Sequence, residues 1–325
     1  MPTQSGRERK LIWTEVMECN RPLHGIIYSK PYGRWSFADL AERAKKKEML
    51  RWLNRFSRSH IQKNRKQLVV FAFDYIGHMI NLDGVYEIAD LDFFFDAMSL
   101  NKGMFSEATA IDIGANIGNH SLYFSDYFQK VVSFEPNPRT YKVLQLNAEL
   151  AKNVLCCNEG ISDANTKLLL EACNTNSGRS AITDNANGNA RSIRVRTLDS
   201  AIDETEIVRL IKIDVEGHEE KALIGAEQTI RRNKPIILFE QHKEDFCNGS
   251  TASIELLKSY GYVNFAVIEN RPLLLKSIPG FLRQKYRSLL RLTIGQTRNL
   301  VIKNNIEPGS YPFIVAIPDW VRLVD

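Results

Sequence analysis

The chain lacks the marks of a disulfide-rich, zinc-binding or membrane-spanning protein. Its 325 residues hold five cysteines, an odd number, with no C-x-x-C pair and no zinc spacing, which argues against a disulfide framework. No apolar run reaches the roughly 18 residues of a transmembrane helix, and the polar start MPTQSGRERK has no signal-peptide core. These absences lead us to expect a cytoplasmic protein, soluble or at most membrane-peripheral.

Hydrophobic residues make up 44% of the chain, enough to bury a full core and to exclude a disordered protein. We expect a basic helical N-terminal extension over residues 1–67 and one large domain over residues 68–325. Ser36 and Asp39 form a possible capping box for a helix that runs to about Phe56.

The net charge of +5 is distributed unevenly. Residues 43–66 contain ten Lys and Arg against one acid, and residues 271–303 contain eight and no acid. The second block lies in a basic insertion, about residues 271–310, whose part after Pro279 has the composition of an interfacial amphipathic helix. Both blocks are compatible either with solvated helix faces or with contact to an anionic membrane or a lipid-linked glycan.

Short β-branched runs recur between residues 108 and 317. They read TAIDIG, KVVSFEP, NVLCCNEG, RLIKIDV, PIILFE, NFAVIE and PFIVAIP. Most are apolar at successive positions, which is typical of strands buried on both faces. We therefore expect an α/β fold with a seven-stranded, mostly parallel sheet and helices on both faces. Two further runs, TKLLLE and SIRVRTL, flank a Gly/Asn-rich loop and could form a hairpin.

The stretch AIDIGANIGNHS ends the first of these strands with Asp112 and two glycines, Gly114 and Gly118. Such a turn lets the backbone approach a ligand closely. Glu135 follows 23 positions after Asp112, a spacing that places an acid at the ribose hydroxyls of a nucleoside. This fits NAD and S-adenosylmethionine alike. The third glycine of the dinucleotide-binding fingerprint G-x-G-x-x-G is absent. The Asp112 carboxylate favours the cationic S-adenosylmethionine over a pyrophosphate.

A third motif, LIKIDVEGHEEKALIGA, places Asp214, Glu216 and His218 at the carboxyl end of the fourth strand, where open α/β sheets bind ligands. Together with IDIGANIGNHS, VVSFEPNP, VRTLDS and PIILFEQH, it resembles the FkbM-type S-adenosylmethionine-dependent methyltransferase family over about residues 68–268. The segment DYIGHMINLDGVYE is also similar to one that precedes the cofactor domain in such proteins. The resemblance implies a class I methyltransferase (Rossmann-like) fold and O-methylation of a sugar, a glycan or a related natural product.

Methyl transfer to a hydroxyl requires in-line alignment and benefits from a base. Our candidate base is His218, and we expect Asp214 and Glu216 to hydrogen-bond substrate hydroxyls. The residues that we expect at the cofactor are Asp112, Gly114, Asn116, Gly118, Asn119, Glu135, Ser162, Asp163 and Asp214.

Several alternatives stay open from the sequence. Asp214 and Glu216, joined by Glu240, could instead bind Mg²⁺, although we expect no metal. The chain could also be an NAD-dependent sugar oxidoreductase, or a non-catalytic binding module of the same fold. Nucleic acid is not an expected partner, because no N/D-P-P-Y/F motif occurs near the fourth strand.

Overall fold

The computed structural model describes residues 37–171, 180–183, 190–247, 249–272 and 296–323. The chain divides into two compact units, Met1–Arg51 and Trp52–Asp325. The expected boundary between residues 67 and 68 stays a prediction.

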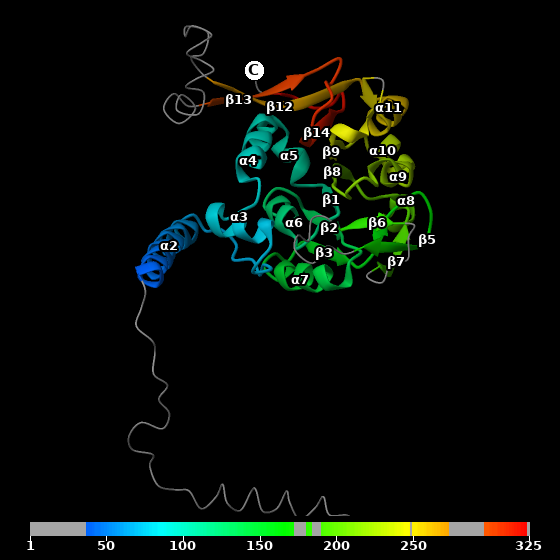
Figure 1. Cartoon of the computed structure of the whole chain (residues 1–325). Helices are drawn as coiled ribbons and strands as arrows, with labels where there is room; N and C mark the ends of the chain where they lie inside the picture. Colours follow the sequence, from blue (N-terminus) through cyan, green and yellow to red (C-terminus); the bar gives the residue numbers. More distant parts are fainter. Residues whose placement is uncertain (1–36, 172–179, 184–189, 248, 273–295, 324–325) are drawn as a thin grey trace, which may run out of the picture. The chain divides into compact units, whose positions relative to one another are not determined.

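An eight-stranded sheet forms the centre of the second unit, in the order β13-β12-β14-β9-β8-β1-β2-β3 (Figure 1). Its strands are β1 (Thr109–Ile113), β2 (Lys130–Phe134), β3 (Val154–Cys157), β8 (Val208–Ile213), β9 (Ile236–Gln241), β12 (Asn264–Pro272), β13 (Gln296–Ile302) and β14 (Tyr311–Ile317). From β3 to β9 all neighbours are parallel, and β14 runs antiparallel between β9 and β12. All seven expected strands are present, and the α/β fold with a mostly parallel sheet is confirmed.

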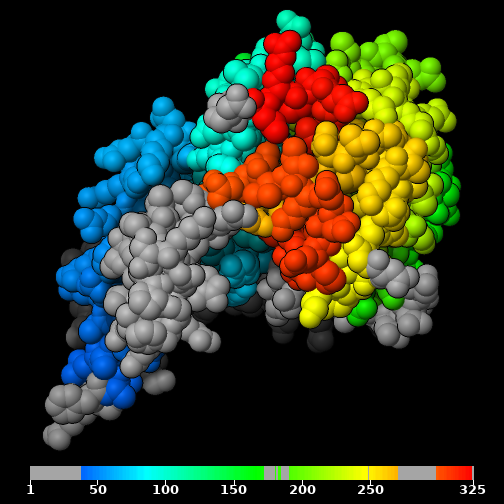
Figure 2. Space-filling view, turned by 90° about the horizontal axis from the view of Figure 1, so that it is seen from above, coloured from blue at the N-terminus to red at the C-terminus, as the bar shows by residue number. Residues whose placement is uncertain are grey.

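The eighth strand, β13, was not expected. It lies in the predicted basic insertion and pairs antiparallel with β12 at the edge of the sheet. In Figure 2 the orange atoms, which belong to β13 and the residues that follow it, lie at the surface of the protein. The amphipathic helix that we expected after Pro279 falls on residues outside the described part of the chain.

Two hydrophobic clusters pack on opposite faces of this sheet, because side chains alternate along each strand. The helices of this unit after α2 (Phe37–Gln62) are α3 (Tyr75–Asp83), α4 (Ile88–Ala97), α5 (Lys102–Phe105), α6 (Asn119–Phe124), α7 (Pro138–Ala148), α8 (Leu198–Ala201), α9 (Glu219–Ile224), α10 (Glu227–Asn233) and α11 (Ala252–Ser259), with 3-10 turns at Ser99–Asn101 and Lys243–Asp245. Ile111 and Ile113 of β1 join the cluster beneath α8 to α11, whereas Ala110 joins the cluster beneath α4 to α6. Helices therefore cover both faces, as expected.

A smaller sheet has the order β4-β7-β5-β6. It comprises β4 (Gly160–Ile161), β5 (Thr166–Glu171), β6 (Ala181–Thr183) and β7 (Ala190–Arg196). Strands β5 and β7 contain the runs TKLLLE and SIRVR and pair antiparallel, so the expected pairing is confirmed. A two-residue ribbon, β10 (Phe246–Cys247) with β11 (Ser250–Thr251), completes the strands of the described residues.

Helix α2 (Phe37–Gln62) is longer than expected, because it continues past Phe56. It exposes large apolar side chains, among them Met49 and Trp52, beside its many basic residues. No helix in the described ranges is both long and apolar enough to cross a membrane. Contact of α2 with an anionic membrane stays a prediction.

Candidate functional site

The glycine turn after β1 lies in close contact with the ends of β2 and β8. Gly114 has a φ of +77°, and a Cβ atom there would lie 1.8 Å from the carbonyl oxygen of Asp214. The N–H groups of Gly114 and Ala115 both donate to the carbonyl of Phe134, at 3.0 and 2.9 Å. Only glycine combines this left-handed backbone with such a close approach. The turn therefore joins the ends of β1, β2 and β8.

Glu135 follows β2 and is 8% exposed. Its two carboxylate oxygens accept backbone N–H groups, Oε2 from Asn116 at 3.0 Å and Oε1 from Asn137 at 2.8 Å. Burial raises the pKa of Glu135 to about 7, although both N–H groups oppose the shift. Each oxygen keeps a lone pair that a ligand hydroxyl can use.

A cavity of about 340 Å³ lies along the carboxyl ends of these strands. Six predicted site residues line it, namely Gly114, Asn116, Glu135, Asp214, Glu216 and His218. Among the described residues, further lining side chains include Tyr75, Tyr86, Glu87, Glu240, His242 and Pro312. The strand ends at which the sequence predicted a site therefore surround one cavity.

Five predicted cofactor residues do not line the cavity: Asp112, Gly118, Asn119, Ser162 and Asp163. Asp112 has no exposed surface, and its Oδ2 accepts a 2.6 Å hydrogen bond from Ser121. The expected direct contact of Asp112 with a cationic ligand is therefore corrected, because the carboxylate lies beneath the turn.

Lys212 supplies the charge that balances this buried carboxylate. Its side chain is 2% exposed, and Nζ lies 3.4 Å from Oδ1 of Asp112 and 3.2 Å from Oδ2 of Asp214. Burial alone would lower the pKa of the Lys212 ammonium, but Asp214 and Asp112 reverse this and hold it above its usual value. Sequence reasoning missed Lys212, although a lysine inside an apolar strand between two acidic strand ends was the available signal.

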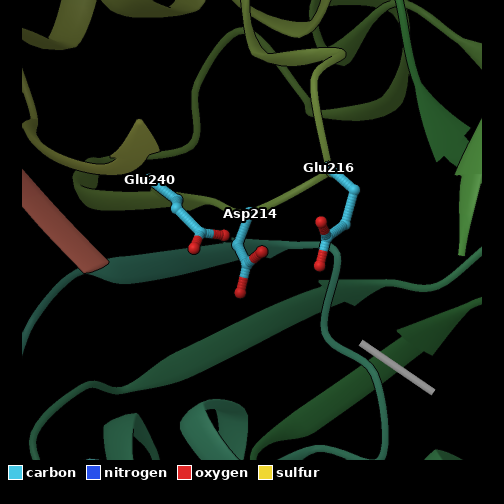
Figure 3. Close-up of side chains that lie close together, drawn as sticks. All are labelled: Asp214, Glu216 and Glu240. Carbon is cyan, nitrogen blue, oxygen red and sulfur yellow. The ribbon is translucent and has the colours of Figure 1, made fainter. Parts of the chain in front are cut away.

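Three carboxyl groups gather above Lys212. Oxygens of Asp214, Glu216 and Glu240 lie within 4.8 Å of one another, and Figure 3 shows the Glu240 carboxyl group turned towards Asp214. Burial, together with the charge and hydrogen bond of Asp214, raises the pKa of Glu240 to about 9. Lys212 holds the pKa of Asp214 below its usual value despite burial. At neutral pH, Glu240 is therefore a neutral acid that donates to the ionised Asp214.

The same three residues are the set that could share a divalent cation in the described part of the chain. His242 borders this set, with Nε2 3.8 Å from a carboxylate oxygen of Glu216 and of Glu240. Carboxylates also accept hydrogen bonds from hydroxyl groups. The cluster is thus suited to bind either a hydroxyl-rich ligand or a hard cation.

His218 lies at the start of α9 and is 7% exposed. Its Nε2 is 2.9 Å from Oγ of Ser162, which donates to Oδ1 of Asp163 at 2.9 Å. Burial, followed by the charge of Lys221, lowers the pKa of His218, and Asp163 partly opposes them. The imidazole is therefore neutral at pH 7.

The segment around Tyr86, which precedes β1 in the sequence, also lines the cavity. The sequence predicted no site residue in this segment. Asn119 holds it in place, because Oδ1 accepts from the Tyr86 N–H at 2.9 Å and Nδ2 donates to its carbonyl at 3.1 Å. Tyr75 contacts the Tyr86 ring edge-on, with centroids 6.3 Å apart. Asn119, which we expected at the cofactor, does not line the cavity and instead holds this segment in place.

Part of the chain is similar to a known protein family. Residues 112–263 match the family model described as methyltransferase FkbM domain. The hexuronic acid methyltransferase AglP of Haloferax volcanii is 30% identical over 130 residues, which cover 37% of this chain and 50% of that protein. The chain thus spans about half the length of this curated relative.

Solved structures were also compared. The FkbM methyltransferase of Methylobacillus flagellatus KT is 23% identical, with a TM-score of 0.31, and the match covers 42% of this chain and 33% of that one. The precorrin-6y C5,15-methyltransferase of Geobacter metallireducens GS-15 is 12% identical, with a TM-score of 0.35 and coverage of 68% and 87%. Residues 112–263 therefore match the methyltransferase FkbM domain, which is the family identified for this part of the chain.

Proposed function

We propose that the protein is an S-adenosylmethionine-dependent methyltransferase that methylates a hydroxyl group of a sugar, a glycan or a related natural product. The observation that carries this proposal is the cavity at the strand ends, in which the Gly114 turn lies beside the buried Glu135 carboxylate. The match of residues 112–263 to the methyltransferase FkbM domain supports the reaction type.

The lining residues fit this methyl donor. Glu135 offers lone pairs to ribose hydroxyls, and Oδ1 of Asn116 is a buried acceptor without a protein partner among the described residues. Gly114 presents backbone rather than a side chain, and Asp214 presents an ionised carboxylate that suits the donor's ammonium or sulfonium group. When bound, S-adenosylmethionine supplies the methyl group as part of a sulfonium ion.

The acceptor would lie against the three-carboxyl cluster. Asp214 and Glu216 can accept hydrogen bonds from neighbouring hydroxyls, while protonated Glu240 can donate one. A polyhydroxylated ring matches this mixed set of donors and acceptors better than an apolar acceptor does. The relative named a hexuronic acid methyltransferase supports a sugar-type acceptor for this chain.

The protein's chemical task is to align the acceptor oxygen and to receive its proton. Orientation of two bound reactants can contribute several kcal/mol. We propose His218 as the base, because its lowered pKa keeps it unprotonated and it lines the cavity. A positioned base typically contributes about 10²- to 10⁴-fold.

Calorimetry of the purified protein with S-adenosylmethionine, and separately with NAD, tests the donor. We expect binding of the first alone, and Glu135→Ala should weaken it by about 10- to 100-fold, since each hydrogen bond to a charged group contributes about 1.5–3 kcal/mol. Glu149→Ala, at an exposed glutamate, should bind as the wild type does. Binding of NAD alone would favour the oxidoreductase.

Turnover tests the reaction itself. Incubation with S-adenosylmethionine and a panel of hexuronic acids and glycans should produce a mass increase of one methyl group, which mass spectrometry detects. The His218→Gln variant should lose most turnover and keep donor affinity. Donor binding without transfer to any acceptor of the panel would favour the non-catalytic binding module, and activity that EDTA abolishes and Mg²⁺ restores would favour the metal alternative.

A further inference from the structure

Two residues that do not line the cavity, Ser162 and Asp163, form a hydrogen-bond chain to His218. Ser162 is 1% exposed and Asp163 is exposed, and neither lines the cavity. The distances from Oδ1 of Asp163 to Oγ of Ser162, and from there to Nε2 of His218, are both 2.9 Å.

This hydrogen-bond chain determines which imidazole nitrogen of His218 carries the proton. An ionised carboxylate only accepts hydrogen bonds, and a serine hydroxyl has one proton to donate. Because Ser162 donates this proton to Asp163, its oxygen can only accept from Nε2 of His218. Neutral His218 is therefore protonated at Nε2 and has its lone pair on Nδ1.

We propose that Ser162 and Asp163 are positioning residues that hold His218 as the Nε2-protonated tautomer, with Nδ1 as the atom that takes the proton of the acceptor hydroxyl. This inference rests on the proposed function, and it reassigns two residues that the sequence had placed at the cofactor. As the acceptor oxygen bonds to the methyl carbon, the carbon–sulfur bond breaks with its electron pair on sulfur. The hydroxyl proton moves to Nδ1 and later to solvent.

Charged groups on both sides of the imidazole act on this step. Lys221, on the same helix, disfavours the imidazolium, and Asp163 favours it through the serine. When His218 accepts the proton, Nε2 keeps its hydrogen bond to Ser162, so the new charge is stabilised by Asp163 without rearrangement. The pair thus both orients the base and supports its charged form.

The tautomer can be measured on the ligand-free protein by ¹⁵N NMR of the histidine side chains, with His218→Gln to assign the signals. The wild type should show a protonated Nε2 and an unprotonated Nδ1. In Asp163→Ala the Ser162 hydroxyl is free to donate to Nε2, so the population should shift towards protonation at Nδ1. Asp163→Asn retains an accepting oxygen and should keep the wild-type tautomer. Since Asp163 is exposed, both variants should fold.

Kinetics then separate positioning from donor binding. Ser162→Ala and Asp163→Ala should lower kcat by about 10- to 100-fold, leave the KM for S-adenosylmethionine within twofold and move the acidic limb of the pH profile to lower pH. Ser259→Ala, an exposed serine, should match the wild type.

A wild-type signal from protonated Nδ1 would overturn the inference, as would a Ser162→Ala variant that loses donor affinity and keeps kcat. A wild type that neither binds the donor nor transfers methyl would refute the proposed function instead, and the NMR result would still decide the tautomer.

Discussion

Lys212 is expected to be one of the most sensitive positions in the protein. It balances the carboxylates of Asp112 and Asp214 at 3.4 and 3.2 Å, and Asp112 has no access to water. The substitution Lys212→Met keeps the approximate volume and removes the charge. Breaking a buried ion pair on one side costs about 3–5 kcal/mol, because the remaining charge is left without compensation.

Urea unfolding of the ligand-free protein measures this loss, and thermal unfolding should show a Tm lowered by roughly 6–20 °C. The matched control is Lys258→Met, which breaks the 2.8 Å ion pair with Glu255. The side chains of Lys258 and Glu255 are 44% and 58% exposed. Such surface pairs contribute about 0–1 kcal/mol. The double variant Lys212→Met with Asp112→Asn should recover part of the loss, since one of the two uncompensated charges is then absent.

A free energy of unfolding for Lys212→Met within about 1 kcal/mol of that of the Lys258→Met control would contradict this role of Lys212. So would a double variant that is less stable than Lys212→Met by the full cost of Asp112→Asn measured alone. In either case the buried lysine would not be the group that compensates the strand-end acids.

Three further predictions concern the cavity. Gly114→Ala should abolish donor binding in calorimetry, because its Cβ would overlap the Asp214 carbonyl, whereas Gly103→Ala, with open space around it, should bind normally. Donor affinity should fall as the pH drops below about 7, since Glu135 then gains a proton and accepts fewer hydrogen bonds; a Glu135→Gln variant should show no such dependence, and an unchanged wild-type affinity from pH 8 to 6 would contradict this. Glu240→Gln should retain stability and most turnover at pH 7, because the amide mimics the neutral acid, and a large loss would show that Glu240 acts as a carboxylate.

Much of this architecture was readable from local pattern. Runs such as TAIDIG and RLIKIDV are apolar at successive positions, and only strands covered on both faces bury such runs fully. The same logic predicted that Gly114, Glu135 and Asp214 lie at one edge, because parallel strands present their carboxyl ends together. Strand β13 escaped prediction because an edge strand needs no doubly apolar pattern.

What the sequence determined by itself was the class of fold and the edge at which the polar residues gather. The tertiary structure alone decided which of them face the cavity. It buried Asp112 against Lys212, placed Ser162 behind His218, and brought Tyr86 to the cavity from a distant segment. The physical reason is that periodicity sets the side of an element on which a side chain lies, whereas its partners depend on packing between elements that are far apart in the chain.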